Sequence, residues 1–277
     1  MTTEAAAKEF AASAARKSAP WLVRFGRLGY VAKGIVYVVM GFLATQAAIG
    51  MGGRTTDTRG ALRTIGEAPF GKLALGIVMI GLFGYAAWRL VSAAMDAERR
   101  GDEPTSIALR IGEAVRGLAY GSLGVWTFRY LTSNTDTGNP TESVTDRALV
   151  MPAGRWIVVA AGLVVIGYAL WQLYKAASGK FLKRLDLSSC ADQTRQWVTW
   201  LGRFGIAARG IVFGMLGALL TRAGWTFDGS GVGIDQSLDA LGAAPLGGIV
   251  FGTVAAGLIA FGIFELATAR FRVMRAF

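Results

Sequence analysis

The stretch LGYVAKGIVYVVMG (28–41) returns twice further along the chain, and this repetition is the strongest indication of the fold. It reappears as IGEAVRGLAYGSLG (111–124) and as FGIAARGIVFGMLG (204–217). In each copy a basic residue precedes a glycine, an aromatic residue follows that glycine after three positions, and another glycine follows it after seven. A recurring unit of this kind is typical of an architecture built from tandem copies.

A second motif repeats in register with the first. APFG (68–71), MPAG (151–154) and APLG (244–247) stand at equivalent positions, and an aromatic residue follows each proline after sixteen residues and again after nineteen. The copies of both motifs lie 83 and then 93 residues apart, which argues against chance similarity. We therefore predict three repeats, over residues 24–95, 107–178 and 200–271, after an N-terminal tail formed by residues 1–23.

Six apolar windows occur, two in each repeat. A helix needs about 20 mostly apolar residues to cross the hydrocarbon core of a bilayer, which is about 30 Å thick. The chain is 53% hydrophobic and 17% charged, and its windows lie at about 28–49, 73–92, 114–132, 155–175, 204–222 and 248–268. The third is the weakest because it holds Arg116 and Arg129. We expect an all-α integral membrane protein whose six transmembrane helices form three αα-hairpin repeats, related by a pseudo-threefold axis along the membrane normal.

The basic residues of the loops predict the orientation of this bundle. They gather in the N-terminal segment, in the loops after the second and fourth windows, and at the C-terminus, whereas the loop after the fifth window holds Asp228, Asp235 and Asp239 and no Lys or Arg. By the positive-inside rule both termini are cytoplasmic, in a multi-pass protein of the inner (plasma) membrane. The net charge of +11 then reflects topology and attraction to anionic inner-leaflet lipids, and it requires no nucleic-acid partner.

The two motifs together resemble a bacterial membrane family, the domain of unknown function twelve-oh-six. The G-x-x-A-[KR]-G-[IL]-V-[YF] opening, the [AM]-P-x-G turn and the Gly-Tyr-x-x-Trp close carry the resemblance, which covers about Arg24 to Phe271. Members look like tandem copies, commonly three, of a two-helix unit. The resemblance therefore implies the fold and implies no activity. The second copy departs most from the pattern, at Ile111–Glu113 and in VMPAG (150–154).

Several kinds of chemistry are disfavoured by composition. The chain has no histidine and one cysteine, so it lacks the commonest metal ligand and general base and cannot form an internal disulfide. The stretch GEAPFGKL (66–73) resembles a nucleotide-binding loop, but Leu73 stands where the Mg²⁺-binding hydroxyl is required. Its counterpart GAAPLGG (242–248) keeps the proline and glycine and not the lysine. We expect no enzymatic activity, no metal and no cofactor.

Charged residues inside the predicted spans form the candidate site, because such residues are costly in a membrane and are usually functional. Lys33, Arg116 and Arg209 occupy equivalent positions in the three repeats. Each lies about 6–9 Å into its span from the cytoplasmic end. Two interpretations stay open. The three side chains form a cationic ring that holds a lipid phosphate or repels cations, or they snorkel to the cytoplasmic interface.

Three further charges accompany this set. Glu113 lies three residues before Arg116 on one helix face, a spacing that lets the two interact. Glu265 occupies the position that Arg89 and Gln172 hold in the other repeats, twenty residues after each proline. Arg89 and Glu265 are therefore expected at one depth, near the ring. Glu265 is either half of a membrane ion pair or a proton-coupled carboxylate.

The outer loops carry one more pattern. In TRGALRTIGEAP (58–69) and DQSLDALGAAP (235–245), leucine or isoleucine recurs at helical spacing and predicts a short helix on the outer face. Two classes of function fit the whole sequence. The first is a non-enzymatic accessory or scaffold subunit of an envelope complex, or a lipid-interacting protein, with anionic lipids and a possible membrane protein as partners. The alternative is a small solute or ion transporter or channel along the pseudo-threefold axis.

Overall fold

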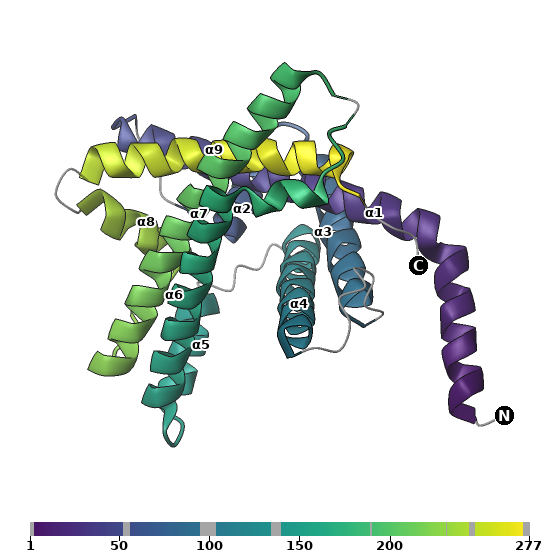
Figure 1. Ribbon diagram of the computed structural model, residues 1–277. Helices are drawn as coiled ribbons and strands as arrows, with labels where there is room; N and C mark the ends of the chain where they lie inside the picture. Colours follow the sequence, from purple (N-terminus) through teal and green to yellow (C-terminus); the bar gives the residue numbers. More distant parts are fainter. Residues whose placement is uncertain are drawn as a thin grey trace.

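The computed structural model describes residues 3–51, 56–94, 104–133, 140–188, 190–230, 232–243 and 247–273. These residues are helical almost throughout (Figure 1), and within them a single β-bridge joins Leu185 to Arg272. In chain order the helices are α1 (Thr3–Ala48), α2 (Thr58–Glu67), α3 (Gly71–Ala94), α4 (Pro104–Ser133), α5 (Pro140–Leu149), α6 (Gly154–Ser178), the 3-10 helix η1 (Lys180–Arg184), α7 (Asp192–Thr226), α8 (Ile234–Ala243) and α9 (Gly247–Phe271). From Thr3 onward the predicted N-terminal tail is helical, and this helix continues into the first predicted span.

Five helical segments within the described ranges are long and apolar enough to cross a membrane. They are Val23–Ala48 of α1 together with α3, α6, α7 and α9. The helix α4 corresponds to the third and weakest predicted span. It is 30 residues long but carries Arg110, Glu113, Arg116 and Arg129, and it is not among the five. The described part of the chain is thus helical apart from one β-bridge and, by length and composition, holds five candidate membrane spans.

The long helices pack as three antiparallel pairs, and each pair joins two different repeats. The helix α9 lies along α1, α4 lies along α3, and α6 lies along α7. In Figure 1 the α1–α9 pair runs across the view, and the other two pairs run down from it. The glycine after each repeated basic residue makes these approaches possible, because a Cβ atom added there would lie within 3.2 Å of an equivalent leucine: Leu266 for Gly34, Leu90 for Gly117 and Leu173 for Gly210. Small residues let helices approach closely within a bilayer.

Packing within the repeats is less uniform. In repeat 1 the helix α1 packs on α3, and in repeat 3 the helix α7 packs on α9. The described residues of α4 and α6, in repeat 2, share no comparable interface. A Cβ atom at Gly205 would lie 2.8 Å from the Cβ of Phe261, and one at the equivalent Gly29 would meet Tyr85. Around Gly112, the same position in repeat 2, nothing lies within 4 Å. The six long helices therefore form a ring that is interrupted between α4 and α6.

One short helix precedes the second long helix of every repeat. The two predicted from sequence are confirmed as α2 and α8, and they bury the equivalent residues Leu62 and Leu238 completely. The side chain of Asp57 caps α2 by accepting a 2.8 Å hydrogen bond from the backbone N–H of Gly60. The third, α5, was not predicted. The described residues that line the charged cavity, introduced below, come from other segments than these short helices.

Candidate functional site

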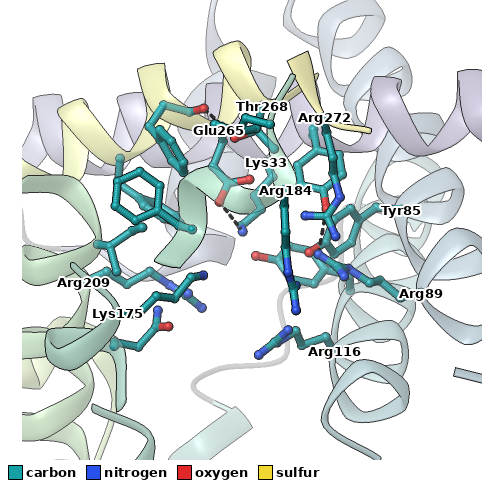
Figure 2. Close-up of a pocket in the computed structure, with 18 of the residues that line it drawn as sticks. Lys33, Tyr85, Arg89, Arg116, Lys175, Arg184, Arg209, Glu265, Thr268 and Arg272 are labelled. Atoms are coloured by element: carbon teal, nitrogen blue, oxygen red, sulfur yellow. Dashed lines mark hydrogen bonds and ion pairs between the residues drawn. The ribbon is translucent and has the colours of Figure 1, made fainter. Parts of the chain in front are cut away.

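A cavity of about 80 Å³ lies where the six long helices converge. Seven basic side chains are among the described residues that line it: Lys33, Arg89, Arg116, Lys175, Arg184, Arg209 and Arg272. Figure 2 shows Arg209 and Lys175 reaching into the cavity from one side and Arg89 and Arg116 from the opposite side. Five of the six charged residues predicted from sequence line this cavity, and the sixth, Glu113, contacts two of them.

Helix geometry explains why the repeated basic residues point inward. Gly34 contacts α9, and Lys33, one residue earlier, is turned by about 100° around the helix toward the space between α1, α3 and α9. Arg116 and Arg209 stand in the same relation to Gly117 and Gly210. All three basic side chains therefore line the cavity at the centre of the ring.

One buried contact in the cavity is an ion pair between repeats 1 and 3. Lys33 Nζ donates to Glu265 Oε1 at 2.8 Å, and each side chain is only 7% exposed. The ammonium group also lies 4.9–6.0 Å from the centroids of four aromatic rings, those of Tyr37, Tyr85, Tyr120 and Phe261. The carboxylate and the ring faces together compensate the cost of burying this charge.

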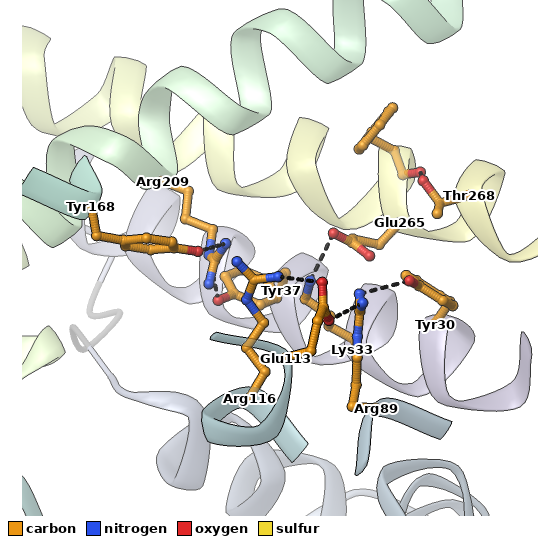
Figure 3. Close-up of polar contacts among 11 residues, drawn as sticks. Tyr30, Lys33, Tyr37, Arg89, Glu113, Arg116, Tyr168, Arg209, Glu265 and Thr268 are labelled. Carbon is orange, nitrogen blue, oxygen red and sulfur yellow. Dashed lines mark hydrogen bonds and ion pairs between the residues drawn. The ribbon is translucent and has the colours of Figure 1, made fainter. Parts of the chain in front are cut away.

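A second cluster joins repeat 1 to repeat 2. Glu113 accepts hydrogen bonds from Arg89 and, at 3.2 Å, from Arg116 (Figure 3). Arg89 also donates to the hydroxyl of Tyr30 at 2.7 Å. The sequence spacing indicated the contact of Glu113 with Arg116, whereas its contact with Arg89 crosses from α4 to α3 and depends on the tertiary fold.

Arg209 is held by two tyrosine hydroxyls from other repeats. Its Nε donates to Tyr37 at 3.0 Å and its Nη1 donates to Tyr168 at 3.3 Å. These contacts tie α7 to α1 and α6. No carboxylate of the described residues is within ion-pair distance of Arg209, so its positive charge remains available to a ligand.

Basic groups outnumber carboxylates in the cavity. Arg184 and Arg272 have further polar interactions of their own, but without them five basic side chains still face two carboxylates, Glu113 and Glu265. Lys175 donates no hydrogen bond to any described residue. Glu265 Oε2 and Arg89 Nε are buried and likewise have no partner among the described residues. The cavity therefore has unused donors and an excess of positive charge, an arrangement that suits an anion with several acceptor oxygens, such as a phosphate.

A loop between α6 and α7 completes one wall of the cavity. The helix η1 contributes Phe181 and Arg184 to the lining. Asp186 N donates to the carbonyl of Phe271 at 2.8 Å, and Val273 N donates to the carbonyl of Arg184 at 3.2 Å. These bonds attach the loop to the end of α9. Hydrogen bonds from Ser188 hold the pKa of the exposed Asp186 below its usual range, so this carboxylate stays charged beside the basic loop.

Sequence reasoning missed three of the basic residues. Lys175 lies one helical turn after Gln172, which holds the position of Arg89 and Glu265, so its place on the same helix face was available as a signal. Arg184 and Arg272 reach the cavity through the η1 loop and its pairing with the end of α9, for which no sequence pattern exists. Among the described residues, no three Asp, Glu, Cys or His side chains gather as metal ligands would.

The fold and the cavity define a class: a membrane protein of tandem two-helix repeats with a cationic centre. The chain belongs to the family of the Domain of Unknown Function (DUF1206), whose model matches it three times, at residues 28–96, 111–179 and 204–272. The predicted family and its three repeats are thereby confirmed. The chain is also 33% identical over 252 residues to the uncharacterized protein YxxB of Bacillus subtilis (strain 168), covering 91% of each chain. No solved structure matches it.

Proposed function

We propose that this chain is a non-enzymatic, multi-pass protein of the bacterial plasma membrane that binds the phosphate group of an anionic lipid in its cationic cavity. The observation that carries the proposal is the convergence of basic side chains from all three repeats on one small space. Lys33 and Arg89 come from repeat 1, Arg116 and Lys175 from repeat 2, and Arg209 from repeat 3. A single phosphate can accept hydrogen bonds from several such groups at once.

The expected depth of the cavity supports a lipid headgroup. The basic residues of the loops favour an orientation with both termini cytoplasmic, which places the cavity at the cytoplasmic end of the spans. Anionic lipids give that leaflet a negative surface potential, which attracts basic groups. An accessory role in an envelope complex is compatible with this activity, since a bound lipid can itself form part of a contact between membrane proteins.

Transport is the second candidate, and Glu265 favours it. A buried carboxylate that has one oxygen paired with Lys33 and the other without a described partner is a group that can exchange a proton. Proteoliposome flux of an anion that disappears in the Glu265→Gln variant would support this role. Lipid binding ranks first because it needs only the charge and the donors of the cavity.

Two substitutions test lipid binding. In Lys175→Gln and Arg209→Gln, retention of phosphatidylglycerol over phosphatidylcholine, measured by native mass spectrometry of the purified protein, should fall by about tenfold or more, because a hydrogen bond to a charged group contributes about 1.5–3 kcal/mol. Lys175 has no hydrogen-bond partner among the described residues, so its loss should leave the fold intact. Arg195→Gln, which removes an exposed charge of α7, is the matched control. Equal retention of the two lipids by the unmodified protein would contradict the proposal.

A further inference from the structure

The closed hairpins of repeats 1 and 3 depend on a small residue in each helix. In repeat 1 a Cβ atom added at Gly81 of α3 would lie 2.7 Å from the Cβ of Ala32 in α1. In repeat 3 the equivalent residues, Gly257 of α9 and Ala208 of α7, are in the same close contact. The space at this crossing therefore accepts one methyl group and no more.

Repeat 2 has a valine at both of these positions. Val115 replaces the alanine and Val164 replaces the glycine, and these side chains are 58% and 71% exposed. Around Gly112 of α4 and Gly167 of α6, nothing lies within 4 Å, although the equivalent Gly29 and Gly84 are in close contact with α3 and α1. Repeat 2 thus carries two branched side chains where the closed repeats carry one methyl group, and its helices α4 and α6 do not pack on each other.

The gap between α4 and α6 leads to the cationic cavity. Arg116 and Tyr120 of α4 and Tyr168 and Lys175 of α6 line the cavity on this side, and all four are partly exposed. By contrast, the lining residues Lys33, Arg89 and Glu265 of repeats 1 and 3 are buried. The Arg116 guanidinium carbon lies 5.9 Å from the centroid of the Tyr168 ring, so these two side chains mark the inner end of the gap.

The outer surfaces beside the gap are apolar. On α4, Val115 and Leu118 are exposed, and on α6, Val164 and Leu170 are exposed. A molecule in the gap would meet positive charge at its inner end and hydrocarbon side chains at its outer end. A soluble phosphate has no group to place against the apolar part, whereas a phospholipid has its acyl chains.

We propose that the space between α4 and α6 is a lateral entrance for a diacyl phospholipid with a negatively charged headgroup. The phosphate binds among Arg116, Lys175 and Arg209, and the acyl chains leave between Val115 and Val164 into the bilayer. The inference rests on the proposed lipid binding and adds the route and the position of the acyl chains. The two aliphatic residues act as spacers that keep repeat 2 open.

Filling the gap tests the proposal. The variant Gly112→Leu/Gly167→Leu places side chains in open space inside the gap, and Gly76→Leu/Gly248→Leu is a matched control, because nothing lies within 4 Å of these glycines either. The full-length protein is given two probes, diacyl phosphatidylglycerol and inorganic phosphate. Filling the gap should weaken phosphatidylglycerol binding by about tenfold or more through steric exclusion of the acyl chains, and should leave phosphate binding unchanged. The control variant should bind both probes as the unmodified protein does.

The outcomes separate the two proposals. Unchanged phosphatidylglycerol binding in the filled variant would overturn the lateral entrance and leave lipid binding standing. Failure of the unmodified protein to bind either probe would overturn the proposed function. Val115→Ala/Val164→Gly gives repeat 2 the residues of the closed repeats, so it should also weaken phosphatidylglycerol binding. If the filled variant does not fold, this second variant tests the lateral entrance in its place. Normal phosphatidylglycerol binding by Val115→Ala/Val164→Gly would contradict the role of the valines.

Discussion

The hairpins of repeats 1 and 3 bring their two helices into contact, whereas the hairpin of repeat 2 leaves its helices apart. Two of the basic groups differ in the same way. The side chains of the Lys33–Glu265 pair, between the closed repeats, are each 7% exposed, while that of Arg116 at the edge of the open repeat is 36% exposed, although its partner Glu113 is buried against Arg89. A repeated motif can thus preserve the contacts between repeats while the contact within one repeat changes. Repeat 2 uses that freedom to expose one side of a charged cavity.

The largest effect should come from breaking the closed side. Glu265→Ala leaves Lys33 buried without its carboxylate, and we expect a loss of about 3–5 kcal/mol in the free energy of unfolding. Arg116→Ala on the open side should cost about 1 kcal/mol or less, because the pair is partly exposed and Glu113 keeps its bond to Arg89. Unfolding in mixed detergent micelles measures both. Equal losses in the two variants would contradict the division into a closed side and an open side.

The same glycine-to-alanine change, made at equivalent positions of two repeats, should destabilise the protein in one repeat and stabilise it in the other. In Gly205→Ala the new methyl group would press on Phe261, and overpacking of this kind costs about 1–3 kcal/mol. In Gly112→Ala the methyl group enters open space, and the gain in helix propensity should stabilise the protein by about 0.5–1 kcal/mol. The same unfolding assay reports both. Destabilisation by Gly112→Ala would show that α4 and α6 are in contact.

The smallest effect concerns the two hydroxyls that hold Arg209. Tyr37 is buried, so Tyr37→Phe should cost about 1–2 kcal/mol by leaving a guanidinium donor unpaired. Tyr168 faces the open side, where water can replace its hydroxyl, so Tyr168→Phe should cost about 0.5 kcal/mol or less. Unfolding measurements on the two single variants make this comparison. A larger loss of unfolding free energy in Tyr168→Phe than in Tyr37→Phe would contradict this ranking of the two hydroxyls.

The parts of the fold that could be predicted depend on local patterns. The three repeats follow from two motifs in register, and α2 and α8 follow from leucines at helical spacing. The opening in repeat 2 could not be predicted, although Val164 stands in the sequence where Gly81 and Gly257 stand in the other repeats. The significance of this valine depends on knowing that those glycines form the contact between two helices.

The candidate site shows the same limit. The sequence placed Lys33, Arg116 and Arg209 at one depth along their helices, because residue number and helical rise fix depth. It left open whether these side chains turn inward, since that direction depends on which face each helix packs. The pairing of Glu113 with Arg89 could not be predicted for the same reason, because it follows from the packing of α4 on α3.

Disulfide formation across the gap measures whether α4 and α6 stand apart, in a protein whose single native cysteine is removed by Cys190→Ser. The pair Ala169→Cys/Gly214→Cys serves as control, because a Cβ atom at Gly214 would lie 3.7 Å from that of Ala169, within the range of about 3.5–4.5 Å that a disulfide requires. We predict that the control pair oxidises readily, while Val115→Cys/Val164→Cys in the same membranes stays reduced. Oxidation of the valine-site pair as fast as the control would mean that repeat 2 is closed, and would contradict the account.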